Sequence, residues 1–347
     1  MIKVIYNNTL RVHDCTYRIF EVGFTIARCA VTGPSGSIKL GGDMAGIIEN
    51  RTFNTDTFIG SEIDNITIME LIGRGAMGAV FVGYQKSLKR KVAVKVFPRD
   101  GADDARGRVH FREEAETVAV LNHPNIVQII DMGATADCLF IVMQMVQGED
   151  LRTMIHRYQR NPIPARRLID VHMVLSIMLP VLDALAYAHE EGVVHQDIKP
   201  GNILIEERSN RPYLADFGIA RSAMSEESDS DIIVGTPLYI APEQIREEQC
   251  DSRSDIYSAG IVLFEALAGK LPFEKNNMET LLSLKMNNPD ELFSVRPSRF
   301  CPAIDGDMER IILKAAASRK GERYQNCRAF HHELSQYYAR RYGGGVQ

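Results

Sequence analysis

The stretch Val193–Asn202, VVHQDIKPGN, decides how this sequence is interpreted. It brings His195, Asp197 and Asn202 into one short loop with a lysine, and the uncharged Gln196 stands directly before Asp197. A carboxylate that can take a proton, a cation and an amide that can bind a metal are together typical of a catalytic loop. The alternative is that Asp197 and Asn202 only form turns and that His195 is a hydrogen-bonded core residue.

The composition fits an ordinary soluble globular protein. Of the 347 residues, 45% are hydrophobic and 24% are charged, and the length allows a core divided between two lobes or domains. The net charge of −5 argues against a general affinity for nucleic acid or for an anionic membrane. The cysteines lack metal-ligand spacing, which favours free thiols in a reducing compartment over a zinc site or disulfides. They are Cys15, Cys29, Cys138, Cys250, Cys301 and Cys327.

A cytoplasmic location is expected. The start of the chain, MIKVIYNN, lacks the basic and then apolar pattern of a secretory signal. The most apolar run, Val171–His189, contains Pro180 and Asp183, and it is predicted to be too short and too interrupted to span a bilayer.

The sequence pattern changes along the chain. Residues 1–60 contain a strand-like run, YRIFEVGFTIARCAV, and a glycine-rich run, so a small β appendage and a partly disordered leader both stay open. Residues from about 65 to 146 contain successive strands and one helix near 105–122, and residues from about 147 to 340 are mainly helical. The sequence therefore predicts an α+β fold in which a strand-rich lobe precedes a helical lobe.

A glycine-rich run, GRGAMGAV at residues 73–80, has the G-x-G-x-x-G spacing that dinucleotide-binding folds also use. A dinucleotide site needs a helix after the last glycine, whereas AVFVGY is β-branched and aromatic. The run is therefore predicted to be strand–turn–strand, a hairpin whose backbone N–H groups can cover phosphates. No G-K-[ST] follows it, which excludes the other common phosphate loop.

Lys95 and Glu114 form a second candidate feature. Lys95 ends an apolar strand, VAVK, where an ordinary lysine at a strand edge is the simplest interpretation. In the following helix Glu114 falls on the apolar face, whereas Glu113 and Glu116 point elsewhere. A carboxylate turned toward a core needs a cation to offset its desolvation, so Lys95 is predicted to be its partner. The apolar residues of that face are Phe111, Ala115, Val118 and Leu121.

These motifs together resemble the signature set of protein kinases. GRGAMGAV, VAVK, HQDIKPGN, DFG at 216–218 and APE at 241–243 occur in the family's order and spacing, accompanied by HPNIV and DIYSAG. The resemblance covers residues from about 65 to 340 and looks closest to bacterial Ser/Thr protein kinases. It implies the two-lobed protein kinase fold over residues 61–342, after an extension of unknown role at 1–60 and before a tail at 343–347.

The resemblance implies a role for each motif residue. Asp197 would be the catalytic base, Lys199 would neutralise charge on the γ-phosphate of ATP, and Asn202 and Asp216 would hold Mg²⁺. Lys95, with its carboxylate partner, would contact the α- and β-phosphates. The other nucleotide-binding residues would be the phosphate loop (Gly73, Arg74, Gly75, Ala76, Met77, Gly78), the adenine contacts Val80, Ala93 and Leu204, the backbone of Gln144 and Val146, and Asp150 at the ribose.

Further residues are implied to be structural or to hold the acceptor. Glu243 would pair with Arg323 in GERYQN, and Asp255 would accept backbone N–H groups of the catalytic loop. Thr236, in GTPLYIAPEQ, would hydrogen-bond near Asp197 and help to hold the acceptor Ser or Thr. The acidic run before it, RSAMSEESDSDII, is predicted to be a solvated, mobile loop.

We therefore expect an ATP- and Mg²⁺-dependent protein serine/threonine kinase. Its expected partners are ATP and proteins with Ser or Thr acceptors, autophosphorylation is compatible with them, and neither nucleic acid nor a membrane is expected. Two alternatives stay open. A small-molecule phosphotransferase of the aminoglycoside-kinase type tolerates a residue other than Arg after the His, but lacks GTPLYIAPE. A catalytically inactive pseudokinase scaffold conflicts with the intact Lys95, Asp197, Asn202 and Asp216.

Gln196 departs from the family pattern, in which most members have Arg before the catalytic base. That Arg is a cation that an activation-loop phosphate neutralises, and an uncharged Gln196 does not need such a phosphate. We hypothesise activity without activation-loop phosphorylation and control elsewhere, for example through residues 1–60. The alternative is that Arg221 or Arg246 supplies the missing cation.

Overall fold

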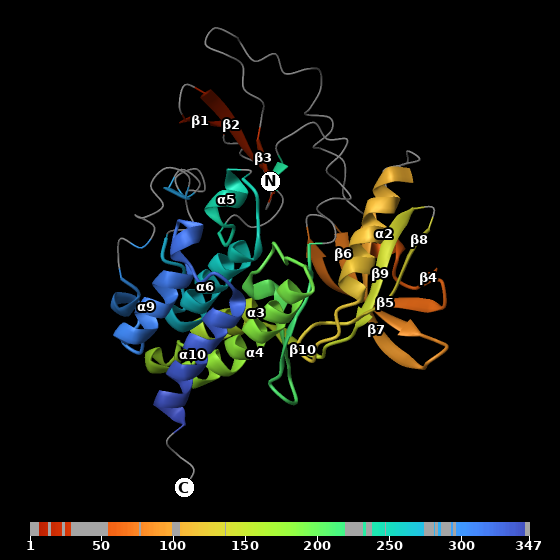
Figure 1. Ribbon diagram of the computed structural model, residues 1–347. Coiled ribbons are helices and arrows are strands. Elements are labelled where there is room, and N and C mark those ends of the chain that lie inside the picture. Colours follow the sequence, from red (N-terminus) through yellow and green to blue (C-terminus); the bar gives the residue numbers. More distant parts are fainter. Residues whose placement is uncertain are drawn as a thin grey trace. The chain divides into compact units, whose positions relative to one another are not determined.

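The computed structural model describes residues 7–12, 15–22, 25–28, 55–75, 78–98, 105–135, 137–218, 232–233, 238–246, 248–273, 281, 284–285, 293 and 296–343. The chain divides into two compact units. The first consists of Met1–Ala119, Gln128–Met145 and Ile219–Gly235, and the second of Val120–Val127, Val146–Gly218 and Thr236–Gln347. The first unit is built mainly of strands and the second mainly of helices, as the α+β prediction requires (Figure 1).

The first unit contains a six-stranded antiparallel sheet and one long helix. The elements are the 3₁₀ turn η1 Thr55–Thr57, β4 Glu62–Ile63, β5 Ile66–Gly75, β6 Gly78–Gln85, β7 Arg90–Pro98, α2 Ala105–Ala119, β8 Ile129–Ala134 and β9 Cys138–Gln144. The strand order is β4-β5-β6-β7-β9-β8. Runs of β-branched and aromatic residues favour these strands, and the strands and helix predicted for this part of the chain are confirmed.

The two faces of this sheet pack against different partners. On one face Phe81 and Val94 are fully buried in a hydrophobic core. Phe58, from the segment before β4, packs onto that core. On the opposite face the ring of Phe97 meets Phe111 of α2 edge to face, with the ring centroids 5.3 Å apart. The face that α2 covers is therefore the one that carries the odd-numbered residues of β7.

A smaller antiparallel sheet also belongs to the first unit. Its strands are β1 Asn7–Val12, β2 Cys15–Val22, β3 Thr25–Arg28 and β13 Ile232–Ile233, in the order β1-β2-β3-β13. The last strand comes from the loop after the DFG motif, and it pairs with β3 through Ile232↔Ala27 and Ile233↔Ile26. Of the two possibilities for residues 1–60, these strands support the β appendage.

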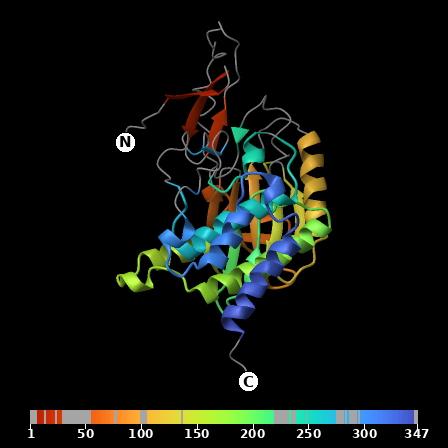
Figure 2. The ribbon, with the colours of Figure 1, turned by 60° about the vertical axis from the view of Figure 1, so that its left-hand side comes forward.

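The second unit is mainly helical. Its helices are α3 Leu151–Gln159, α4 Val171–Glu190, α5 Pro242–Ile245, α6 Ser252–Ala268, α8 Pro297–Phe300, α9 Gly306–Ala315 and α10 Cys327–Tyr342, with 3₁₀ turns η2 Pro164–Arg166, η3 Pro200–Asn202 and η6 Lys320–Glu322. A small sheet joins β10 Gly148–Asp150, β11 Ile203–Glu206 and β12 Pro212–Leu214. Helix α6 packs against α4 and α9, and α10 packs along α4 (Figures 1 and 2). The mainly helical pattern predicted for residues from about 147 to 340 is confirmed.

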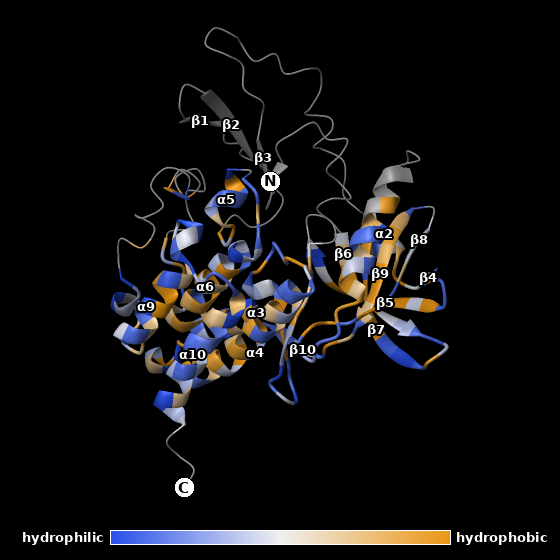
Figure 3. Ribbon diagram, viewed as in Figure 1, coloured by the Kyte–Doolittle hydropathy of each residue, from blue (hydrophilic) through white to orange (hydrophobic). Residues whose placement is uncertain are grey.

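The apolar helix α4 belongs to the core of this unit. The stretch Pro164–Glu190, which includes α4, is long and apolar enough to cross a membrane by length and composition alone, so the prediction that this run is too short and too interrupted was wrong. Its residues Leu175, Met178, Val181 and Leu185 are fully buried, and hydrophobic residues gather along α4 and α6 (Figure 3). Packing against α6 and α10 therefore accounts for its composition.

Candidate active site

The loop His195–Asn202 is anchored by one buried carboxylate. Asp255, in the first turn of α6, accepts the backbone N–H groups of His195 and Gln196, each at 2.8 Å. His189 Nε2 lies 2.8 Å from the same carboxylate. Gln196 has a left-handed backbone with φ of +63°, which a residue other than glycine keeps only when its surroundings hold it there. The predicted structural role of Asp255 is confirmed.

His195 is fully buried and hydrogen-bonded on both ring nitrogens. Its Nδ1 accepts the N–H of Asp197 at 3.3 Å, so Nε2 carries the proton that it donates to the carbonyl of Ala215 at 3.0 Å. Burial lowers the pKa of His195, although the charges of Asp255 and Asp197 oppose this shift. The ring also lies 4.4 Å from the ring of Phe217. His195 is therefore a neutral core histidine that joins two segments of the loop, as the structural interpretation of this residue predicts.

Asp197 is surrounded by donors from its own loop. Lys199 Nζ lies 2.5 Å from Asp197 Oδ2, and Asn202 Nδ2 donates to the same oxygen at 3.0 Å and to the Asp197 carbonyl at 2.8 Å. The side chains of Asp197 and Lys199 keep 30% and 27% of their surface exposed. Because the loop engages Oδ2, Oδ1 is the oxygen that can accept a proton from a substrate hydroxyl.

Asn202 and Asp216 are brought near each other by backbone hydrogen bonds. The N–H of Ala215 donates to the carbonyl of Asn202 at 2.9 Å, and the N–H of Gly218 donates to the carbonyl of His195 at 3.3 Å. Asp216 is held in the left-handed region with φ of +59°. Because Asn202 turns its Nδ2 into the loop, its Oδ1 can act as a ligand, and an amide oxygen with a carboxylate suits Mg²⁺. These residues fit the ion that the resemblance implies.

In the first unit, Lys95 lies on the sheet face that α2 covers. Lys95 Nζ is 5.4 Å from the ring centroid of Phe97, the ring that packs on α2. Along α2, Glu114 is half-buried, whereas Glu113 and Glu116 are exposed. The predicted register of this helix is confirmed, and the ion pair between Lys95 and Glu114 stays a prediction.

The predicted adenine contacts Val80 and Ala93 share this face with Lys95. Val80 lies directly opposite Lys95 in the pairing of β6 with β7, and Ala93 lies opposite Met143 in the pairing of β7 with β9. Directly opposed residues of an antiparallel pair, and residues two apart on a strand, place their side chains on the same face. Val80 and Met143 are only half-buried, so this strip of the sheet keeps apolar surface for a planar ring.

The glycine-rich run forms the predicted strand–turn–strand. β5 ends at Gly75, β6 begins at Gly78, and these two glycines pair, while Ala76–Met77 lie outside the described residues. A Cβ on Gly78 would lie 2.2 Å from a carbonyl oxygen of β7, so only glycine fits this approach. The side chain of Arg74 hydrogen-bonds to Thr55, a contact that the sequence did not indicate.

Asp150 and Leu204 lie opposite each other in the pairing of β10 with β11, so their side chains share a face. Asp150 also caps α3, because its Oδ1 accepts the N–H of Thr153 at 2.7 Å. This capping role was missed from the sequence, although an Asp directly before a helix is its usual signal. Gln144 donates its N–H within the first unit, and Val146 is half-buried in the second.

Gln244 links the catalytic loop to the segment that follows it, and sequence reasoning missed this residue. Its Nε2 donates to the carbonyl of Gln196 at 3.1 Å, and its Oε1 accepts the N–H of Ala241 at 3.0 Å. Arg246, considered as a substitute cation, lies 4.0 Å from Glu248. Other residues with a predicted role lie outside the described residues, namely Thr236, Arg221 and the loop Ser222, Ser225, Ser228 and Ser230 with its acidic neighbours.

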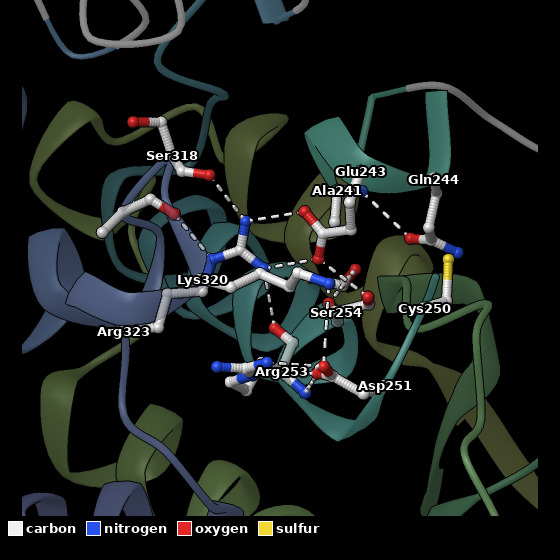
Figure 4. Close-up of polar contacts among 12 residues, drawn as sticks. Ala241, Glu243, Gln244, Cys250, Asp251, Arg253, Ser254, Ser318, Lys320 and Arg323 are labelled. Carbon is white, nitrogen blue, oxygen red and sulfur yellow. Dashed lines mark hydrogen bonds and ion pairs between the residues drawn. The ribbon is translucent and has the colours of Figure 1, made fainter. Parts of the chain in front are cut away.

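The pair Glu243–Arg323 is the predicted structural ion pair, and it is confirmed (Figure 4). Two parallel bonds join the side chains, Nη1 to Oε1 at 2.6 Å and Nη2 to Oε2 at 2.8 Å, and both residues are buried. Ser254 Oγ adds a bond to Oε1 at 2.8 Å. Burial alone would raise the pKa of Glu243, but the hydrogen bonds and charge of Arg323 outweigh it and lower that pKa. Arg323 also donates to the carbonyls of Arg253, Ala317 and Ser318.

A strand-rich unit with a glycine hairpin, followed by a helical unit with this loop, defines the fold of protein kinases. Residues 66–334 match the protein kinase domain, and the chain belongs to that family. It superimposes on the crystal structure of the Mycobacterium tuberculosis PknI kinase domain with a TM-score of 0.61 and 27% identity, covering 80% of this chain and 97% of that one.

Two curated proteins illustrate the relationship. The chain is 36% identical over 296 residues to serine/threonine-protein kinase pkn3 of Myxococcus xanthus, which covers 82% of this chain and 52% of that protein. It is 37% identical over 261 residues to serine/threonine-protein kinase PrkC of Bacillus subtilis, which covers 74% of this chain and 38% of that protein. The chain thus spans about half the length of these relatives or less.

Replacing Arg323 by methionine should destabilise the protein by about 3–5 kcal/mol, because Glu243 would stay buried without its cation. Denaturant unfolding measures the loss. The control Arg319→Met removes an exposed arginine 3.4 Å from Glu322 and should cost less than about 1 kcal/mol. The double variant Glu243→Gln, Arg323→Met should recover part of the loss, and equal stabilities of the two arginine variants would contradict the prediction.

The pH dependence of this pair follows from the pKa of Glu243, which is lowered on folding from its ordinary value of 4.5. The pair should therefore stabilise the protein at pH values above 4.5 and lose that effect as the pH falls further.

Proposed function

We propose that this chain is an ATP- and Mg²⁺-dependent protein kinase that transfers the γ-phosphoryl group to serine and threonine hydroxyls of proteins. The observation that carries the proposal is the position of Asp197, whose Oδ2 is held by Lys199 and Asn202. Backbone hydrogen bonds join its loop to the segment that contains Asp216. The names of the similar proteins, which are serine/threonine-protein kinases, support the class of acceptor.

The proposed reaction uses these side chains for positioning and charge. The oxygen of the acceptor hydroxyl forms a bond to the γ-phosphorus of ATP, and the bond between that phosphorus and the ADP oxygen breaks. Asp197 Oδ1 accepts the proton that the hydroxyl loses. Lys199, already 2.5 Å from the base, offsets the charge that develops on the transferred group. Bound Mg²⁺ would neutralise phosphate charge, and Asn202 and Asp216 are the residues that would hold it.

Further residues are proposed to contact the nucleotide. Lys95, oriented by Glu114, would meet the α- and β-phosphates, and the hairpin N–H groups would cover them. The apolar strip of the first unit would take the adenine ring. The residues proposed for the remaining contacts are Val80 and Ala93 with Leu204 at the ring, the Gln144 carbonyl and Val146 N–H at its edge, and the second carboxylate oxygen of Asp150 at the ribose.

A protein acceptor is favoured over a small molecule because the chain has the GTPLYIAPE segment. The described part of it, Leu238–Glu243, is largely buried and is tied to the catalytic loop through Gln244. A cytoplasmic location, where ATP is available, remains our proposal. Binding of nucleic acid or a membrane is not part of it.

Independence from activation-loop phosphorylation also remains a proposal. The backbone of Gln196 is fixed by a carboxylate and an amide, with its N–H on Asp255 and its carbonyl on Gln244, and its side chain is exposed. In addition, β13 of the activation loop pairs with β3 of the N-terminal extension. That pairing supports control through residues 1–60.

Replacing Ser222, Ser225, Ser228 and Ser230 together by alanine should leave the activity of phosphatase-treated protein within about twofold of the wild type, because no cation at 196 awaits a phosphate. Transfer of labelled phosphate to a protein acceptor measures this. Loss of most activity in the alanine variant would mean that the loop switch persists without the arginine.

Asp197→Asn should lower kcat by about 10²–10⁴-fold, because the amide cannot accept the hydroxyl proton. Asp216→Asn should abolish transfer and also weaken Mg²⁺-dependent nucleotide binding, because it removes an anionic oxygen ligand. The matched control is Asp170→Asn at the N-terminus of α4, where asparagine caps equally well and activity should be unchanged. Near-normal turnover by Asp197→Asn would contradict the proposed base.

Glu114→Gln should lower kcat/KM for ATP by about 10–100-fold, because Lys95 would no longer be oriented toward the phosphates. Glu116→Gln on the exposed side of the same helix is the matched control and should change little. Steady-state kinetics with varied ATP provides the comparison. Equal effects of the two substitutions would mean that Lys95 is positioned without Glu114.

A further inference from the structure

The backbone carbonyls of Leu238, Tyr239 and Ile240 accept hydrogen bonds from buried side chains. Lys285 Nζ donates to the carbonyls of Leu238 and Ile240, each at 2.8 Å, and Ser258 Oγ donates to the carbonyl of Tyr239 at 2.8 Å. This part of the chain lies in no helix or strand, so its carbonyls depend on such donors. We call residues 238–241 the acceptor segment.

Lys285 is fully buried, which makes its position informative. Its Nζ lies 5.4 Å from the ring centroid of Tyr257 and 5.5 Å from that of Phe273. Burial lowers the pKa of Lys285 well below its ordinary value, with the charge of Glu243 opposing the shift. Both the charged and the neutral amine have at least two N–H donors, so the two carbonyl bonds persist in either form. An amine at this depth is stable only where such acceptors converge on it.

The acceptor segment is connected to the catalytic base. The N–H of Ala241 donates to Gln244, and Gln244 donates to the carbonyl of Gln196, the residue before Asp197. The hydroxyl of Tyr239 is bonded to the buried Glu265 on the same α6 helix that carries Ser258. Changes in the shape of the segment would therefore reach the surroundings of the base through two hydrogen bonds.

We propose that Lys285 is a positioning residue for the protein acceptor: by holding the carbonyls of Leu238 and Ile240 it fixes the shape of the acceptor segment beside Asp197. The inference rests on the proposed function, because it assigns the acceptor and not ATP to this segment. Lys285 acts through the backbone and touches no reacting atom.

The test is Lys285→Met, which keeps the side-chain volume and removes both donors. If the released segment adopts its binding shape about a tenth of the time, the KM for a protein acceptor rises about tenfold, while kcat and the KM for ATP stay within about twofold. Hydrogen exchange of the backbone amides should increase at residues 238–241 and stay unchanged in α4.

Two more variants accompany this one. Ser258→Ala removes the bond to the Tyr239 carbonyl, together with a bond to the Ser254 carbonyl inside α6, and is mild enough for the chain to fold, so the acceptor KM should rise by about two- to threefold. Lys314→Met, on α9, is the matched control, because Lys314 also lies over an aromatic ring, 4.2 Å from the centroid of Tyr324. It should leave the acceptor KM and exchange at 238–241 unchanged.

Unchanged acceptor KM and unchanged exchange at 238–241 in folded Lys285→Met protein would overturn the proposal. An equal rise in the KM values for ATP and acceptor would also overturn it, because that pattern indicates a general loss of structure. If the wild-type chain transfers no phosphate to dephosphorylated casein or to itself, the proposed function fails instead. The exchange measurement then still decides whether Lys285 holds the segment.

Discussion

The catalytic loop depends on a carboxylate that the protein buries almost completely. Asp255 would be costly at that depth without donors, and the left-handed Gln196 would be strained without an acceptor for its N–H. The N–H groups of His195 and Gln196 compensate for burying the carboxylate, and the carboxylate stabilises the left-handed backbone of Gln196. The same carboxylate holds the backbone of His195, and the ring of His195 is in turn bonded to the N–H of Asp197 and the carbonyl of Ala215. One carboxylate at the start of α6 therefore helps to place both Asp197 and the DFG segment.

Features that depend on local periodicity could be predicted from the sequence. The strands around the glycine hairpin and the buried face of α2 follow from two- and 3.6-residue repeats, which is why Glu114 could be separated from Glu113 and Glu116. The pair Glu243–Arg323 spans 80 residues, and only the resemblance to protein kinases could predict it. The apolar character of α4 was recognised, but a core helix and a membrane helix have the same local pattern.

Polar side chains buried by distant packing could not be predicted. A lysine is normally exposed, and nothing near Lys285 in the sequence identifies the two carbonyls of residues 238 and 240 as its acceptors. The bond from Gln244 to the carbonyl of Gln196 is similar, because the two residues are 48 positions apart, whereas its other partner, Ala241, is local. Asp150 was assigned to a ligand, and the sequence reasoning overlooked that one carboxylate oxygen would cap a helix.

The six-stranded sheet of the first unit also uses residues that precede the kinase family match, which begins at residue 66. The ring of Phe58 lies 6.0 Å from that of Phe81, and the backbone of Gly60 and Ser61 bonds to Ile68 of β5. A fragment trimmed to the family boundary would expose one side of Phe81 to water and leave β5 with unpaired backbone groups. The smallest piece of this protein that can fold by itself is therefore set by its packing, and homology alone would cut it too short.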